Sequence, residues 1–75
     1  MKYDNLCPGT RIRVDTFINS CLHGIVGTVL RKGKLLGQLA YMVRFDNPVR
    51  YPGGRLCCED LIFAHEICLV SKDVL

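Results

Sequence analysis

Four residues of the sequence have the side chains that a tetrahedral zinc site uses. One residue separates Cys21 from His23, and two residues separate His65 from Cys68. Thiolate sulfur and imidazole nitrogen are the usual ligands of structural zinc, but the first pair is closer than the common spacing of about two to four residues. Nothing in the sequence brings the two pairs together. We therefore predict no metal and no other cofactor, with zinc at these four residues as the alternative.

The chain has five cysteines, which is a high share for 75 residues. The count is odd, no export signal is recognisable near Met1, and the apolar content of 49% is enough for a core without disulfides. We expect reduced thiols that are mostly buried, Cys21 and Cys68 among them. Cys57 and Cys58 are neighbours, so in a strand they would point to opposite faces and would not bond to each other. A redox role would need nearby positive charge, for which Arg55 is the only close candidate.

Sequence signatures of common enzyme sites are absent: there is no Gly-x-Ser-x-Gly, no phosphate-binding loop ending in Lys-Ser or Lys-Thr, and no His-Glu-x-x-His. Glu59 and Asp60 are adjacent carboxylates, but acids before Leu61 are typical of the start of a helical turn, where the backbone dipole favours negative charge. A small barrel is also filled by its own side chains, which leaves no dry pocket. We expect no catalytic residues and no enzymatic activity.

The remaining candidate site is a set of basic residues with a tyrosine among them. The net charge of +3 favours anionic partners without requiring nucleic acid. Arginine can bind carboxylates with two parallel hydrogen bonds and can stack on rings, and both arginine and tyrosine are common at the centre of interfaces. A solvated charged face without a function is the simpler alternative. The predicted partner-binding residues are Arg31, Lys32, Lys34, Arg44, Arg50, Tyr51 and Arg55.

Alternating side chains predict the strands that would position these residues. In residues 10–15, Ile12 and Val14 share one face, and in residues 39–45 the residues Leu39, Tyr41, Val43 and Phe45 share one face, which is the pattern of half-buried strands. Further strands are predicted over residues 24–31, 55–58 and 66–70. The predicted breaks between them are a loop over residues 31–34, a strand end at residues 46–48, a turn over residues 51–54 and a helical turn over residues 59–61.

Five short strands without a long helix predict an all-β fold. A closed or nearly closed five-stranded barrel would remove the exposed edges of such a small sheet. A chain of this length supports one hydrophobic core, so residues 1–75 are predicted to form one domain with its core over about residues 6–70. No apolar stretch approaches the roughly 20 residues that cross a bilayer.

The order of these segments resembles SH3-like barrels. The resemblance lies in Pro8-Gly9-Thr10-Arg11-Ile12-Arg13-Val14, Gly24-Ile25-Val26-Gly27-Thr28-Val29, Tyr41-Met42-Val43-Arg44-Phe45-Asp46 and Glu59-Asp60-Leu61. The layout of these segments is similar to that of the photosystem I accessory subunit PsaE, the variable chain of ferredoxin–thioredoxin reductase, the barrel of the nitrile hydratase β subunit, and KOW-type modules. The resemblance implies an accessory or docking role, and for KOW-type modules it implies contacts with RNA or with ribosomal and transcription proteins.

Two functions follow as expectations. The first is a non-catalytic accessory or protein-binding module that docks its basic, loop-rich face onto an acidic surface of a larger protein, with Tyr51 as an apolar anchor. The alternative is an RNA- or DNA-binding module of KOW-like type that uses the same basic face, because the same side chains can contact phosphates and stack on bases. We expect a cytoplasmic protein without a membrane partner, and homodimerisation through an edge strand stays open.

Overall fold

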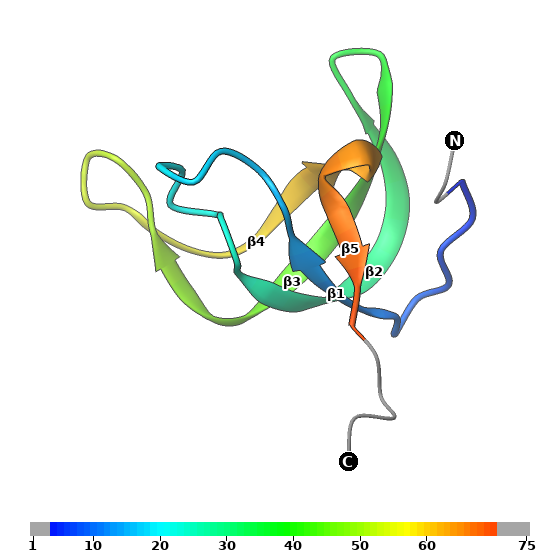
Figure 1. Cartoon of the computed structure of the whole chain (residues 1–75), viewed down its shortest axis with the longest axis horizontal. Coiled ribbons are helices and arrows are strands. Elements are labelled where there is room, and N and C mark those ends of the chain that lie inside the picture. Colours follow the sequence, from blue (N-terminus) through cyan, green and yellow to red (C-terminus); the bar gives the residue numbers. More distant parts are fainter. Residues whose placement is uncertain (1–3, 71–75) are drawn as a thin grey trace.

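The computed structural model describes residues 4–70, which form five antiparallel strands in one sheet (Figure 1). The strands are β1 (Arg11–Val14), β2 (Val26–Leu35), β3 (Gln38–Arg50), β4 (Leu56–Phe63) and β5 (Ile67–Leu69), with a 3-10 turn, η1 (Ala64–Glu66), before the last strand. Their order across the sheet is β4-β3-β2-β1-β5. The all-β prediction is confirmed. The sheet is not closed, because β4 and β5 lie at its two edges, so a barrel is not observed.

The core lies on the face of the sheet that the alternating pattern predicts. Ile12, Val14, Tyr41, Val43 and Phe45 are all buried, as expected. The partners of this group come from every strand, since Val29 in β2, Ile62 in β4 and Ile67 in β5 pack into the same cluster. Within residues 4–70, no helix is long and apolar enough to cross a membrane.

The predicted loop over residues 31–34 is wrong, because these residues continue β2. Gly33 pairs with Ala40 and Lys34 with Leu39, and the chain reverses only at Leu36 and Gly37. Both turn residues have positive φ angles, 52° and 77°, which is the geometry of a two-residue hairpin turn that follows the twist of the strands. The charged side chains do not interrupt the strand because they lie in solvent on a ribbon that is paired only with β3.

The predicted end of the third strand at residues 46–48 is also wrong, since β3 continues to Arg50. The strand makes a large bulge instead: Arg44 pairs with Glu59 and Val49 with Cys57, so residues 45–48 lie opposite Cys58 alone. A bulge bends its strand and increases the local twist. It takes up Pro48, which has no N–H to donate, without ending the strand.

The prediction of one short helical turn near the C-terminus is confirmed, but its predicted position over residues 59–61 is wrong. These residues lie inside β4, and the helical turn is η1, three residues beyond Leu61. Glu59 is held in the strand by pairing with Arg44, both through the backbone register and through an ion pair of 2.9 Å between Glu59 Oε2 and Arg44 Nη2. The predicted turn over residues 51–54 is confirmed by the hydrogen bond from Gly54 N to Tyr51 O of 2.9 Å.

Candidate docking site at the loop-rich end

The structure divides six of the seven predicted partner-binding residues between two ends of the sheet and leaves Arg44 between them. Strands β2, β3 and β4 run back and forth in sequence, so the β2–β3 turn and the β3–β4 turn must lie at opposite ends (Figure 1). Arg31, Lys32 and Lys34 are exposed on the half of β2 that leads to the first turn. Arg44 lies between the two ends in its ion pair with Glu59. The second turn brings together Arg50, Tyr51 and Arg55.

The β3–β4 turn is built by short backbone and side-chain contacts. Tyr51 N donates to Arg55 O over 2.7 Å, and Arg50 Nη1 donates to Gly54 O over 3.3 Å. Gly53 and Gly54 both have a φ of 90° or more, a conformation that side chains with a Cβ seldom adopt. The Arg55 guanidinium carbon lies 5.9 Å from the centroid of the Tyr51 ring, within the range of a cation–π contact. The turn therefore brings together two arginines and one aromatic ring, with Arg55 over the ring.

Tyr51 is fixed in place and is not a free anchor. Its side chain is half-buried against the core, and its hydroxyl donates to Asp60 Oδ2 over 2.7 Å. Burial raises the pKa of Tyr51 well above its ordinary value, and the hydrogen bond to Asp60 and the nearby negative charge of that carboxylate raise the pKa further. The phenol consequently stays neutral and keeps donating, so the ring forms a rigid wall under Arg55.

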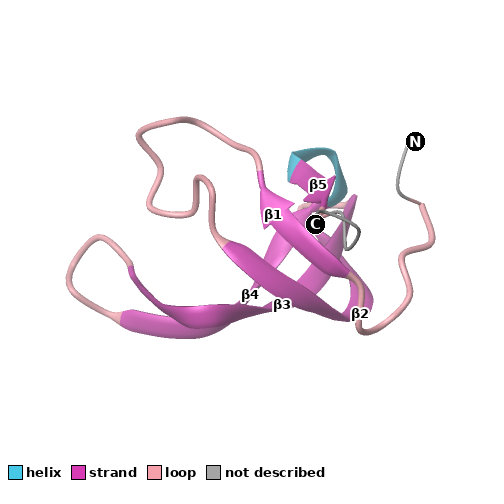
Figure 2. Ribbon diagram, turned by 60° about the horizontal axis from the view of Figure 1, so that its bottom comes forward, coloured by secondary structure: helices cyan, strands magenta, loops and turns pink. Residues whose placement is uncertain are grey.

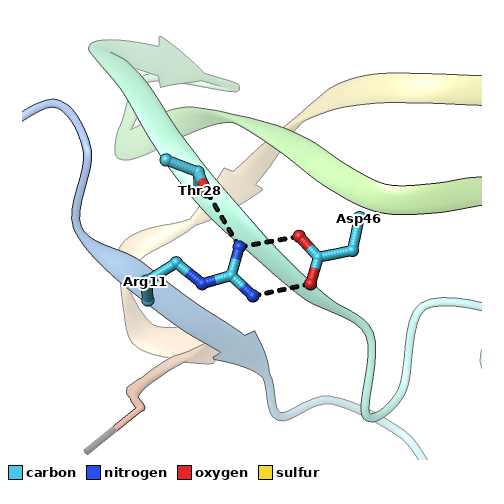
Figure 3. A network of polar contacts seen from close by, with 3 residues as sticks. All are labelled: Arg11, Thr28 and Asp46. Carbon is cyan, nitrogen blue, oxygen red and sulfur yellow. Dashed lines mark hydrogen bonds and ion pairs between the residues drawn. The ribbon is translucent and has the colours of Figure 1, made fainter. Parts of the chain in front are cut away.

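The bulge of β3 is tied to the rest of the sheet by Arg11 (Figure 3). Arg11 Nη1 and Nη2 donate to the two Asp46 carboxylate oxygens over 2.7 and 2.6 Å, and Nη1 also donates to Thr28 Oγ1 over 3.0 Å. One guanidinium in β1 thus connects β2 and β3. The hydrogen bonds from Arg11 hold the pKa of Asp46 below its ordinary value of 3.8.

The Asp46 contact predicts a dependence of stability on pH. Because the folded-state pKa of Asp46 is lowered, its contribution is fully present above about pH 3.8 and is lost as the pH falls through the folded-state value. We expect Asp46→Asn to lower the urea midpoint at pH 7, and we expect the difference from the wild-type chain to shrink as the pH falls below 3.8. Urea titrations at several pH values measure both. A difference that is the same at pH 7 and pH 2 would contradict the assignment.

A pocket of about 560 Å³ lies between the β1–β2 loop and the bulge of β3. Both views place this loop and the β3–β4 turn on the same side of the molecule (Figures 1 and 2). The lining of the pocket combines apolar residues with a few polar and charged ones, which is the composition of a binding site. We call it the Pro48 groove; its lining residues are Cys21, Gly24, Ile25, Val26, Asp46, Asn47, Pro48, Val49 and Arg50.

Phe17 and Ile18, each 79% exposed, lie in the same β1–β2 loop whose residues Cys21, Gly24 and Ile25 line the Pro48 groove. They were missed as site residues from the sequence. The sequence signal that could have identified them is two adjacent large apolar residues that lie outside every predicted strand. Their exposure contrasts with the core, where apolar residues of similar size are buried.

The four candidate zinc ligands have separate surroundings. His23 Nδ1 donates to Thr16 O over 3.0 Å, the His65 ring stacks on Phe63 with centroids 5.2 Å apart, and Cys68 Sγ contacts Asp15 Oδ2 at 3.6 Å. In the part of the chain that the structure describes, no three histidine, cysteine or acidic side chains are grouped so that they could hold a metal ion. The structure thus does not bring the two pairs together.

The prediction of mostly buried thiols is wrong. Cys7, Cys21 and Cys58 are exposed, whereas Cys57 and Cys68 are partly buried, and all five are free. Cys21 is exposed because it lies in the β1–β2 loop at the rim of the Pro48 groove and not in a strand.

The chain matches no family model, no curated protein and no solved structure. Its function is therefore inferred from the geometry of these two ends.

Proposed function

We propose that this chain is a non-catalytic protein-binding module of the cytoplasm that docks its loop-rich end onto a larger protein. The docking site comprises the Pro48 groove, the exposed pair Phe17 and Ile18, and the two arginines of the β3–β4 turn. The partner presents an acidic segment with an apolar side chain. The resemblance to SH3-like barrels stays a prediction beside it, supported by the five antiparallel strands and the helical turn before β5.

The exposure of Phe17 and Ile18 is the observation that carries the proposal. Burying a side chain of this size contributes about 1.5–3 kcal/mol, and leaving these two in water forgoes that contribution in the free chain. A partner that covers both would recover it. Adjacent exposed apolar residues in a loop that also lines a concave, partly apolar site are typical of a protein interface.

The charge of the same end favours an acidic partner. Within residues 4–70 the ion pairs engage Arg11 and Arg44, whereas Arg50 contacts a backbone carbonyl and Arg55 a ring. Arg50 and Arg55 are both exposed and keep donors available for carboxylates. Asp46 adds little opposing charge because Arg11 neutralises it. The half-buried Tyr51 contributes a fixed surface under Arg55.

Affinity purification with matched variants tests the proposal. We expect the untagged wild-type chain to co-purify from its native cells with a stoichiometric protein, identified by mass spectrometry. The double variant Phe17→Ser, Ile18→Ser and the double variant Arg50→Gln, Arg55→Gln should each reduce recovery of that protein at least tenfold. Leu36→Asn is the control, since it removes an exposed apolar residue at the opposite end of the sheet.

Two outcomes would contradict the proposal. One is the recovery of nucleic acid without any stoichiometric protein. The other is a protein that is recovered equally by the wild-type chain and by the two loop-end variants, provided that circular dichroism shows that all variants keep the β-sheet spectrum.

A further inference from the structure

The end of the β2–β3 hairpin that carries its turn projects from the sheet as a free two-stranded ribbon. β1 pairs with β2 only as far as Thr28, and the last rung between β3 and β4 joins Ala40 to Phe63. Beyond that rung, residues 34–39 are paired only with each other (Figure 1). We call residues 31–42 the arm: residues 34–39 are its free end, and residues 31–33 and 40–42 are its base, where Ala40, Tyr41 and Met42 also pair with β4. At about 3.4 Å per residue, its turn lies roughly 10 Å beyond the last rung with β4.

The arm is basic on both faces. Arg31, Lys32 and Lys34 are exposed, and alternation along the strand places Arg31 on one face and the two lysines on the other. Lys32 Nζ donates to Asn5 Oδ1 over 2.7 Å, a contact at the surface. The sequence has no aspartate or glutamate between Asp15 and Asp46, so no acidic residue of the arm offsets these charges.

The turn of the arm carries an apolar residue in a conformation that does not favour it. Leu36 has a φ of 52° and is 86% exposed. Asparagine or glycine is the usual residue at this position of a two-residue hairpin turn, because a Cβ crowds the backbone in the left-handed region. Leucine is therefore unfavourable here in its backbone and in its exposure, and residues held in such conformations cluster at functional sites.

We propose that the arm binds duplex DNA by entering a groove, with its basic residues on the phosphates and Leu36 against the base edges. The major groove admits a two-stranded β-ribbon and is about 8.5 Å deep, which matches the length of ribbon beyond the last rung. Its walls are two phosphate backbones, which suits cations on both faces of the arm. Leucine can contact thymine methyl groups there, or wedge between bases in the minor groove.

The shape and the charge of the arm favour duplex DNA over other anionic partners. An acidic protein patch would engage only one face of the ribbon, and the major groove of double-stranded RNA is too narrow for side chains to read. Binding to a lipid surface depends on buried apolar area, and the arm offers only one fully exposed apolar residue, Leu36. The inference concerns the end of the sheet opposite the Pro48 groove and is independent of the proposed docking function.

Fluorescence anisotropy with a labelled duplex of about 20 base pairs, over a series of KCl concentrations, tests the inference. Three phosphate contacts predict a slope of about −3 for log K against log [KCl], with a dissociation constant of about 100 µM or below in roughly 50 mM KCl. Lys34→Gln should make the slope less steep by about 1. Arg13→Gln is the matched control, because it removes one exposed charge on β1 outside the arm and should leave the slope unchanged.

Leu36→Asn separates the apolar contact from the charges. The variant should melt at the same temperature as the wild-type chain or higher, since asparagine tolerates the left-handed conformation. Its affinity for the duplex should fall roughly tenfold with the salt slope unchanged, because no phosphate contact is lost.

Several results would overturn the inference. They are no binding at low salt, an equal slope for the wild-type chain and Lys34→Gln, and unchanged affinity of Leu36→Asn. Equal or tighter binding to phosphatidylcholine vesicles with phosphatidylserine, to double-stranded RNA or to a poly-glutamate peptide would also overturn it. Phe17→Ser, Ile18→Ser should bind the duplex like the wild-type chain, so a failure here and a failure of the docking proposal can be told apart.

Discussion

Replacing Tyr41 with alanine is expected to lower the free energy of unfolding by about 3–5 kcal/mol. Tyr41 is the largest fully buried side chain and lies at the centre of β3, the strand that pairs with both β2 and β4. The change removes a ring from the core and leaves a cavity that the sheet cannot fill. A chain of this size is stabilised by roughly 4–11 kcal/mol in total, so much of the variant should be unfolded in modest urea.

Tyr41→Phe is the matched control for this variant. It keeps the ring and removes the hydroxyl that accepts a hydrogen bond from Leu6 N over 3.0 Å. We expect a cost of about 1 kcal/mol from the lost acceptor. Urea unfolding followed by circular dichroism measures both variants. A cost below about 1 kcal/mol for Tyr41→Ala would mean that Tyr41 is not in the core.

Gly27→Ala is expected to cost about 2–3 kcal/mol, although it adds only one methyl group. A Cβ at Gly27 would lie 2.5 Å from the carbonyl oxygen of Arg44 and 2.7 Å from Val43 Cγ1. The first neighbour is backbone of the adjacent strand, so β2 and β3 would have to move apart just before the bulge. Thermal and urea unfolding of the purified variant measure the effect.

Gly33→Ala tests whether this cost comes from the close approach or from the loss of any glycine in β2. A Cβ at Gly33 would meet only Leu61 Cδ2, at 3.2 Å, and this side-chain end can move aside. Alanine is also the better strand residue of the two by roughly 0.5–1 kcal/mol. We expect a change within about 1 kcal/mol of zero. Equal losses at the two glycines would refute the close-approach explanation.

The core was predictable because it follows a local rule. Strict alternation in residues 39–45 places Tyr41, Val43 and Phe45 on one face whichever strands lie beside them. The β2–β3 reversal was not predictable in the same way. Gly33 and its charged neighbours have the composition of a turn, yet the reversal falls at Leu36, a residue that turns seldom use.

The end of β3 depended on a contact that is distant in sequence. Asp46, Asn47 and Pro48 end most strands, but here the carboxylate of Asp46 is held by Arg11, 35 residues earlier. That contact and the pairing of Val49 with Cys57 carry the strand past the proline. No local pattern contains this information, because both partners come from other strands.

The candidate site was predictable in part. Residue types alone pointed to Arg50, Tyr51 and Arg55, and the β3–β4 turn does bring these three together. Composition could not separate them from the lysines of β2, since only the strand order shows that the two groups lie at opposite ends. Phe17 and Ile18 were missed because their exposure follows from the path of a loop, which alternation does not describe.

Hydrogen–deuterium exchange of the chain alone and in complex with its co-purified protein tests whether the loop-rich end is the docking surface. We expect slower exchange over residues 17–25 and 46–55 in the complex, with exchange in residues 34–39 of the arm unchanged. Protection confined to the arm or to the β5 edge, with residues 17–25 and 46–55 exchanging as in the free chain, would contradict it.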